Sequence, residues 1–431
     1  MRIVLSTFGS FGDVHPYMAI GLELKARGHQ VVIATMELYR EKIESVGLEI
    51  APVRPRLSPP REQDEELINK ILHPRKGPQY LLQQIIFPAV RDSYDDLLVA
   101  VSGADLLVTH PAAPAGPLVG RKTGMRWVSS VLAPISFFSA YDPPVPPQWA
   151  WFNKLRILGP TVVDLFHNLV KTFFHAKEVE KFRAELGLAD YGNPIFDGQH
   201  SPTLVLALFS SVFAATQPDW PTQTRITGFP FYDGGLETPM PQQLLDFLDH
   251  GPPPIVFTLG STAVWVAQDF YKQSIEASRR LKRRAVLLIG DERNTPPALP
   301  EDVIAVDYAP FQSLLPRACA VVHSGGIGST AQALRAGVPT VIVPFAFDQP
   351  DNADHARRLG VSRTLARYKY TATTATRELG ELLGDSRYAQ RATEVGDKLR
   401  RENGAARAAD LLEHAMGLSE DKEELAYAAG D

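Results

Sequence analysis

The sequence predicts an α/β protein built from two Rossmann-like, doubly wound domains that face a central cleft. Three observations support this fold class. The chain has 431 residues, more than the roughly 100–200 residues of a usual single domain. A strand, a glycine-rich loop, a helix and a second strand open the chain, and the alternation of strands and helices restarts after residue 254.

The first domain opens with residues 2–6, a short run of β-branched and aliphatic side chains, followed by the glycine-rich segment 8–12. Apolar residues then recur at helical spacing over residues 17–27, and Gly28 fits the glycine that often follows a helix. Residues 31–34 have the composition of the next buried strand. Later strands of this sheet are predicted at 106–108 and 127–131.

The second domain repeats this alternation, with buried strands predicted at 255–259, 285–289, 320–322 and 340–343. Residues 228–253 are rich in proline and glycine, so we place the linker there. The predicted domains are therefore 1–227 and 254–416, followed by an acidic, alanine-rich flexible tail at 417–431.

Two stretches of the sequence are predicted to be irregular. Residues 51–80 are crowded with proline and charge, and residues 142–147 contain four prolines. Long insertions in α/β domains often carry function, although plain connecting loops are at least as common.

Composition narrows the possible partners. A formal net charge of -5 gives no broad basic surface, so nucleic acid is not an expected partner. No stretch approaches the roughly 18 unbroken apolar residues of a membrane span, and the opening apolar run is too short for a secretory signal. The one cysteine, Cys319, lies in an apolar run without metal-ligand spacing around it. We expect a soluble, cytoplasmic protein.

A glycine-rich loop at residues 323–330 is the strongest candidate for a binding site. It directly follows a predicted strand and precedes a helix-like run. Glycines allow the backbone to approach a ligand, and the amides at a helix N-terminus favour a diphosphate. The glycines are Gly325, Gly326 and Gly328, and the side chains that can add hydrogen bonds are His323, Ser329 and Thr330.

Asp348 and Gln349 follow the predicted strand 340–343. Open α/β sheets bind ligands at the carboxyl ends of their strands, and adjacent carboxylate and amide groups suit the hydroxyls of a sugar. The competing interpretation is that these residues only cap the next helix.

Together these segments resemble the donor-binding signature of the UDP-glycosyltransferase superfamily, whose members have the GT-B fold. Residues 12–16, Gly-Asp-Val-His-Pro, extend the resemblance over essentially the full chain. Among bacterial members, the chain is similar to the rhamnosyltransferase of rhamnolipid synthesis at residues 200–202, 219–221 and 227–230.

The resemblance implies a metal-independent enzyme that moves a hexose or deoxyhexose from a UDP- or dTDP-sugar to a hydroxyl, with inversion of the anomeric carbon. The first domain would bind the acceptor, the second would bind the nucleotide sugar, and no cofactor is implied. The implied donor-binding residues are Ser261 near the phosphates, Tyr308, Ala309 and Phe311 at the base, His323, Ser329 and Thr330 at the β-phosphate, and Asp348 and Gln349 at the sugar.

Gln332 departs from the family pattern. Many relatives have a glutamate here that binds the ribose hydroxyls, whereas an amide lacks the stronger charge-assisted hydrogen bond. This substitution leaves dTDP-sugars open as donors beside UDP-sugars.

Transfer to a hydroxyl requires a base that removes its proton, and the loop after the first strand offers Asp13 and His15. Many relatives have histidine where Asp13 stands, and others, including the transferases of glycopeptide antibiotics, have aspartate. We favour Asp13, whose pKa would rise if the carboxyl were partly buried. Asp13 could also cap the following helix, which is compatible with catalysis only if one oxygen stays free. His15 is the second candidate; it could instead line the acceptor site or brace Asp13, while His110 and His167 are expected to make ordinary surface or packing contacts.

The acceptor is expected to be small, apolar and hydroxylated, such as a flavonoid-like phenol or a hydroxy lipid. Phe137, Phe138 and Trp149 lie around the proline-rich stretch 142–147 and are the predicted acceptor-binding residues.

Three other functions compete with this prediction. A nucleotide-sugar epimerase can share the two-domain architecture, because fold does not fix function. A non-catalytic helper that binds nucleotide sugars is disfavoured by the intact Asp13 and phosphate loop. An NAD-dependent dehydrogenase is disfavoured because residues 9–12 lack the dinucleotide glycine spacing and no acidic residue ends the strand at 31–34.

Overall fold

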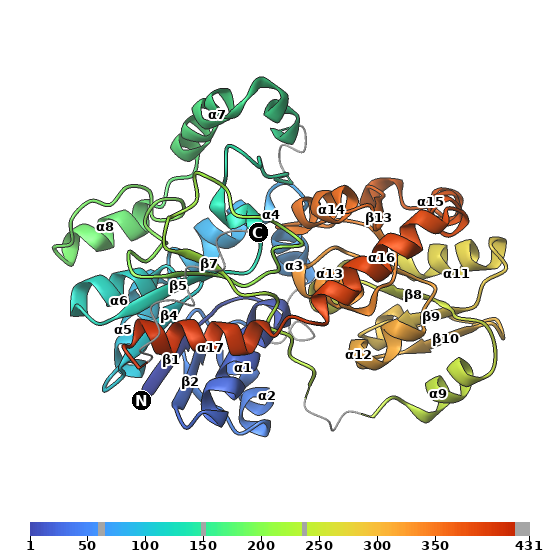
Figure 1. The fold of residues 1–431 in the computed structure, drawn as a ribbon, viewed down its shortest axis with the longest axis horizontal. Coiled ribbons are helices and arrows are strands. Elements are labelled where there is room, and N and C mark those ends of the chain that lie inside the picture. The colour runs from blue at the N-terminus through green and yellow to red at the C-terminus, as the bar shows by residue number, and fades with distance from the viewer. Residues whose placement is uncertain (59–64, 148–151, 235–238, 419–431) are drawn as a thin grey trace.

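The computed structural model describes residues 1–58, 65–147, 152–234 and 239–418. Two parallel sheets, each with helices around it, lie side by side (Figure 1). The first sheet has the order β3-β2-β1-β4-β5-β6-β7 and the second the order β10-β9-β8-β11-β12-β13. The strands are β1 Arg2–Ser6, β2 Gln30–Thr35, β3 Glu49–Pro52, β4 Leu106–Thr109, β5 Trp127–Val131, β6 Val205–Ala207, β7 Thr224–Ile226, β8 Ile255–Thr258, β9 Ala285–Leu288, β10 Val303–Val306, β11 Ala320–His323, β12 Thr340–Ile342 and β13 Ser362–Thr364.

The helices of these layers have the following bounds: α1 Phe11–Ala26, α2 Arg40–Ser45, α3 Glu65–Ile71, α4 Gly77–Tyr80, α5 Val90–Ala100, α6 Ala115–Thr123, α7 Pro160–Phe173, α8 Lys177–Glu185, α9 Gln242–Asp249, α10 Gly260–Ala263, α11 Phe270–Arg280, α12 Phe311–Leu314, α13 Ile327–Ala336, α14 Gln349–Arg358, α15 Ala372–Gly384, α16 Ser386–Leu399 and α17 Gly404–Ala415.

The order of the strands decides which loops meet. In the first sheet β1 pairs with β2 on one side and with β4 on the other. In the second sheet β8 lies between β9 and β11. At such a reversal of strand order, the loops leaving the carboxyl ends diverge to opposite faces and open a binding crevice. The loops after β1 and β4 are therefore neighbours, and so are the loops after β8 and β11.

Helix α1 begins six residues earlier than the sequence predicted. Its first turn is held by a capping box, in which the Ser10 hydroxyl accepts the Gly12 N–H and Asp13 accepts the Ser10 N–H. The helix therefore starts at Phe11 and contains Pro16 within it. The prediction missed this start because the first two turns look like a glycine- and proline-containing loop in sequence.

The predicted domain boundaries need three corrections. Helix α9 lies in the predicted linker 228–253, but its Leu244 and Leu248 pack in the core of the second domain. The stretch 51–80 is not wholly irregular, since α3 and α4 form there. Ile68 of α3 and Leu72, the residue after it, pack in a core cluster of the second domain.

Helix α17 is the third correction, because it packs against α1 of the first domain although the sequence placed it in the second (Figure 1). Arg27 anchors this crossing through ion pairs with Asp410 at 2.7 Å and Glu413 at 2.8 Å. These corrections share a cause, since an amphipathic helix shows in sequence that it has a buried face but not which sheet covers it.

Candidate active site

Asp13 lies on the first turn of α1, where the chain leaves β1. Its Oδ2 accepts hydrogen bonds from the Ser10 N–H at 2.7 Å and the Ser10 hydroxyl at 3.1 Å. The carboxylate sits so close over Gly9, whose φ is 138°, that a Cβ there would lie 2.2 Å from Oδ2. The cap therefore uses one carboxylate oxygen and leaves Oδ1 for another role.

The surroundings of the Asp13 carboxyl raise its pKa to near neutral pH. Burial raises its pKa to about 7, although the hydrogen bonds from Ser10 oppose this and 31% of the side chain is exposed. The negative charge of Asp348, from the second domain, adds to the increase in the pKa. A carboxylate with a pKa near the working pH is well suited to general-base catalysis.

His110 is the residue beside Asp13 that the sequence prediction missed. It directly follows β4, and its Nε2 lies 3.8 Å from Oδ1 of Asp13. Its Nδ1 accepts the Ala112 N–H, so the ring proton is on Nε2 and faces the carboxylate. Burial lowers the pKa of His110 to about 3, so the ring is neutral. The sequence predicts only an ordinary surface or packing contact for His110. The signal that could have found it is its position directly after the strand that pairs with β1.

His15, the second candidate base, points away from Asp13. Residues two apart on a helix do not face each other, and the His15 ring packs on Tyr232 at 4.8 Å and on Phe11 at 5.1 Å. Burial and the charge of Lys42 lower its pKa to about 4. His15 therefore does not brace Asp13.

The loop between β11 and α13 has the features of an anion site. His323 Nδ1 accepts the Gly325 N–H, while its Nε2 is buried without a hydrogen-bond partner. Burial lowers the His323 pKa to about 4, so the ring is neutral and Nε2 carries a proton to donate. Buried donors are normally paired, so this one is consistent with a ligand. The first N–H groups of α13 add donors without intrahelical partners.

The glycines of this loop have distinct roles. Gly325 has φ 89°, and a Cβ there would lie 2.6 Å from Ile342, so the turn requires glycine. Apart from its own stretch of backbone, a Cβ built on Gly326 or Gly328 would meet no atom of the described residues within 4 Å, so those positions face open space. A side chain at Gly326 or Gly328 would occupy the space next to the donors of the loop.

The hydroxyl residues of the loop differ in what they can offer a ligand. Thr330 is buried, and its hydroxyl donates to the Gly326 carbonyl at 3.0 Å, so its proton is already used. A Cβ on Gly260, after β8, would lie 3.3 Å from the Ser329 hydroxyl, which puts the predicted Ser261 loop beside this one. Ser261 itself is exposed.

Asp348 and Gln349 begin α14, as predicted for the carboxyl end of β12. Asp348 occupies the N-cap position but makes no side-chain cap; instead its Oδ2 accepts from Asn352 at 2.6 Å. Burial raises the Asp348 pKa to about 6. Gln349 Oε1 accepts the Phe345 and Ala346 N–H groups, which orients the side chain and leaves its NH₂ as the donor.

Comparisons with known proteins agree with this arrangement. The family model "Erythromycin biosynthesis protein CIII-like, C-terminal domain" matches residues 280–412, and "Glycosyltransferase family 28 N-terminal domain" matches residues 3–87. The O-mycaminosyltylonolide 6-deoxyallosyltransferase of Streptomyces fradiae is 34% identical over 96% of this chain and 97% of its own length. The chain belongs to the UDP-glycosyltransferase superfamily.

More distant relatives share the fold of this glycosyltransferase. The sterol 3-beta-glucosyltransferase of Neurospora crassa is 28% identical over 94% of this chain, which spans only 26% of that protein. The spinosyn forosaminyltransferase has a TM-score of 0.71 at 18% identity, covering 97% of this chain and 99% of its own. The spinosyn rhamnosyltransferase complexed with thymidine diphosphate has a TM-score of 0.68 at 18% identity, and the match covers 96% of this chain and 100% of that one. The predicted fold and enzyme class are confirmed, and the epimerase alternative finds no support in these relatives.

The predicted base-binding residues of the glycosyltransferase lie between β10 and α12. Tyr308 is 57% exposed, Ala309 is buried, and Phe311 starts α12 half-buried. Gln332 accepts a hydrogen bond from Arg335 at 2.8 Å, and Arg335 also pairs with Asp233 of the linker. The NH₂ of Gln332 is therefore its remaining hydrogen-bonding group.

The predicted acceptor aromatics pack with other aromatic residues of the first domain. Phe137 stacks on Trp220 with ring centroids 4.0 Å apart. Phe138, which has φ 51°, contacts His167 at 4.4 Å and Phe196 at 5.0 Å. Both rings contribute to packing, and Trp149 lies outside the described residues.

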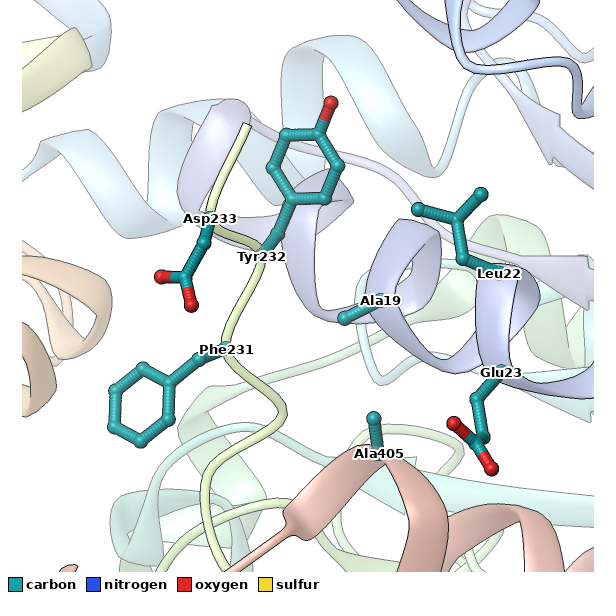
Figure 2. A pocket seen from close by; sticks show the side chains of 7 residues that line it. All are labelled: Ala19, Leu22, Glu23, Phe231, Tyr232, Asp233 and Ala405. Atoms are coloured by element: carbon teal, nitrogen blue, oxygen red, sulfur yellow. The ribbon is translucent and has the colours of Figure 1, made fainter. Parts of the chain in front are cut away.

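A cavity of about 310 Å³ lies where the linker passes between α1 and α17. Two of its lining residues contact predicted site residues, because Tyr232 packs on His15 and Asp233 pairs with Arg335, which donates to Gln332. Figure 2 shows linker residues 231–233 beside Ala19, Leu22 and Glu23 of α1 and Ala405 of α17. The cavity lies where the chain passes from the first domain into the linker and where α17 returns to α1. Among the residues that the structure describes, no three metal-ligating side chains converge, and no helix is long and apolar enough to cross a membrane.

Proposed function

We propose that this glycosyltransferase moves a hexose or deoxyhexose from a UDP- or dTDP-sugar to a hydroxyl of a small apolar acceptor, with inversion and without a metal ion. The observation that carries the proposal is Asp13, whose Oδ1 is free of the helix cap and whose pKa is raised to about 7 next to Asp348 of the donor domain.

The reaction is a single displacement. The acceptor oxygen attacks the anomeric carbon, its proton passes to Oδ1 of Asp13, and the bond from that carbon to the diphosphate oxygen breaks. The electron pair leaves with the diphosphate, where the Nε2–H of His323 and the N-terminal amides of α13 stabilise the charge that develops. Attack opposite to the leaving group inverts the anomeric configuration.

Asp348 and Gln349 hold the sugar. The carboxylate accepts from sugar hydroxyls and the amide NH₂ donates to a hydroxyl oxygen, because the Gln349 oxygen is held by the backbone. The Nε2–H of His110 stabilises the ionised form of Asp13. In this mechanism the donors of the protein take the place that a divalent cation has in metal-dependent transferases.

The substrate classes follow from the named relatives and from Gln332. One relative is named for transfer to O-mycaminosyltylonolide and another for transfer to a sterol, which is an apolar alcohol. The rhamnosyltransferase neighbour was solved with thymidine diphosphate, and Gln332 lacks the charge of the glutamate expected in UDP-dependent members. Both observations favour acceptance of dTDP-sugars.

A panel of UDP- and dTDP-sugars against flavonoid-like phenols, sterols and hydroxy lipids tests the proposal, with products read by mass spectrometry. The anomeric coupling constant of the product should report inversion, and EDTA should leave the rate unchanged. Release of nucleoside diphosphate only with an acceptor is expected for a transferase. A retained anomeric configuration, or full loss of transfer in EDTA that magnesium restores, would reject the corresponding part of the proposal.

A further inference from the structure

The proline-rich loop, residues 142–147, has no role in the proposed chemistry, yet the structure buries it. Pro143, Pro144, Val145 and Pro146 are all buried. The segment just before the loop is fixed to the first domain, because Asp219 accepts the Ser139 hydroxyl at 2.7 Å and the Ala140 N–H at 2.6 Å. The loop therefore leaves a fixed point in the acceptor domain.

The loop itself is held by the donor domain. The Val145 N–H donates to Oδ1 of Asp351 on α14 at 2.9 Å. Arg358, two turns further along α14, forms an ion pair with Asp142 at 3.0 Å. Between them, the His355 ring packs on Phe213 of the first domain with centroids 5.0 Å apart. Successive turns of α14 thus contact the first domain.

Asp351 is unusually placed for a carboxylate. It is 2% exposed, and its Oδ2 is buried without a hydrogen-bond partner, with His355 Nε2 at 3.6 Å. Burying a carboxyl group with one oxygen that accepts no hydrogen bond destabilises the folded state, so it lowers the free energy of unfolding. Stability of the fold alone does not explain this residue, since an apolar side chain of similar size would avoid that cost.

The same helix presents the residues that bind the sugar. Residues three and four apart are neighbours on a helix surface. Asp348 and Asn352 therefore border the side of α14 that carries Asp351, His355 and Arg358 and contacts the proline-rich loop and the first domain. The face that grips the proline-rich loop and the face that meets the donor sugar are rigidly joined.

We propose that Asp351 is a positioning residue, which clamps the proline-rich loop to α14 and thereby holds Asp348 and Gln349 opposite Asp13. This inference rests on the proposed function. The clamp acts on the sugar-binding end of the donor site, and α14 meets the diphosphate loop at Asn352, whose side chain donates to the Gly325 carbonyl at 3.0 Å. Loss of the clamp should therefore weaken turnover more than binding of the nucleoside diphosphate.

The test compares Asp351→Ala with Asp351→Asn, which keeps an acceptor for the Val145 N–H. Arg357→Ala is the matched control on α14, because Arg357 is 51% exposed and pairs only with Asp354 among the described residues. Asp351→Ala should lower kcat about ten-fold or more, as expected when the buried Val145 N–H is left without an acceptor. Its affinity for UDP and dTDP should stay within about two-fold, and Asp351→Asn should recover most of the rate.

Hydrogen exchange provides a readout that does not depend on activity. Val145 carries the one backbone N–H in residues 143–147, since the other four are prolines. Its exchange should be slow in the wild type and in Asp351→Asn, and fast in Asp351→Ala. If Asp351→Ala does not fold, Asp142→Asn replaces it, with a smaller loss of kcat and again no change in diphosphate affinity.

The outcomes separate this inference from the proposed function. Fast Val145 exchange with a wild-type kcat in Asp351→Ala would overturn the positioning role. Equal losses in Asp351→Asn and Asp351→Ala, or an equal loss of diphosphate affinity, would also overturn it. If the wild-type protein transfers no sugar, the proposed function is rejected. The clamp is then tested by two measurements that do not need turnover. The first is Val145 exchange, and the second is whether Asp351→Ala still binds a nucleotide sugar more tightly than the corresponding nucleoside diphosphate, as the wild type would.

Discussion

The rate of transfer should follow the ionisation of Asp13. Because burial and Asp348 raise the Asp13 pKa to about 7, the base is protonated and inactive at lower pH. About 1% of a group with this pKa is ionised at pH 5 and about 90% at pH 8. The value of kcat/KM for the acceptor should therefore rise roughly 90-fold over this range and level off above pH 8. An aspartate with an ordinary pKa near 3.9 would change by only about 10%.

The assay measures the initial rate against pH at a saturating concentration of donor. Asp348 has a pKa of about 6, in the same range as that of Asp13. Saturation with donor limits the effect that its titration has on the measured rate. His323 and His110 stay neutral throughout, because burial lowers the pKa of each to 4 or below. Asp13→Asn should lower the rate by about 10²–10⁴-fold, the usual contribution of a general base, and flatten the profile. Asp351→Asn removes the other carboxyl with a pKa of about 7 and should keep the midpoint.

Two results would refute this reasoning about Asp13. A flat profile from pH 5 to 8 in the wild type would mean that the Asp13 carboxyl is not the titrating base. An Asp13→Asn variant that keeps most of its rate, together with a His15→Ala variant that loses it, would transfer the role to His15.

Three further predictions concern the neighbours of Asp13 and the donor site. His323→Ala should weaken UDP and dTDP binding by about 1.5–3 kcal/mol without weakening acceptor binding, and calorimetry with unchanged diphosphate affinity would remove this loop from the site. His110→Phe should move the midpoint of the pH profile upward, because the Nε2–H nearest to Oδ1 of Asp13 is lost; an unmoved midpoint would show that His110 only packs. Wild-type enzyme should use dTDP-sugars at least comparably to UDP-sugars, and Gln332→Glu should shift preference toward UDP by no more than about 0.5–1.5 kcal/mol, since Arg335 would also pair with the new carboxylate. Competition between paired donors of one sugar measures this, and strong rejection of dTDP-glucose by the wild type contradicts it.

Much of the donor side could be predicted from the sequence. The strand, glycine-rich loop and helix around His323 are contiguous in the chain, so their order in sequence is their order in space. The same holds for Asp348 and Gln349, which the prediction placed at the end of a strand and the structure places at the start of α14. Local hydrogen bonding and strand–helix alternation suffice for such segments.

The surroundings of Asp13 could not be predicted in the same way. His110 is 97 positions from Asp13 along the chain and reaches it because β4 pairs directly with β1. The proline-rich loop was predicted as an irregular segment, and its contact with Asp351 crosses between the domains. Phe137 and Phe138 were assigned to an acceptor site by their aromatic character, which does not distinguish a pocket from the packing that they make.

The sequence alone determined the two α/β domains, and it predicted the glycine-rich loop at 323–330 as a diphosphate site and Asp13 as the base, because each depends on periodicity, turn chemistry or a short motif. Tertiary structure decided which side chains meet Asp13, which sheet α3, α9 and α17 cover, and how α14 holds both the sugar site and the proline-rich loop. These features depend on strand order and on packing between residues far apart in the chain. A hydrophobic pattern states that a face is buried, and only the folded chain supplies the surface that buries it.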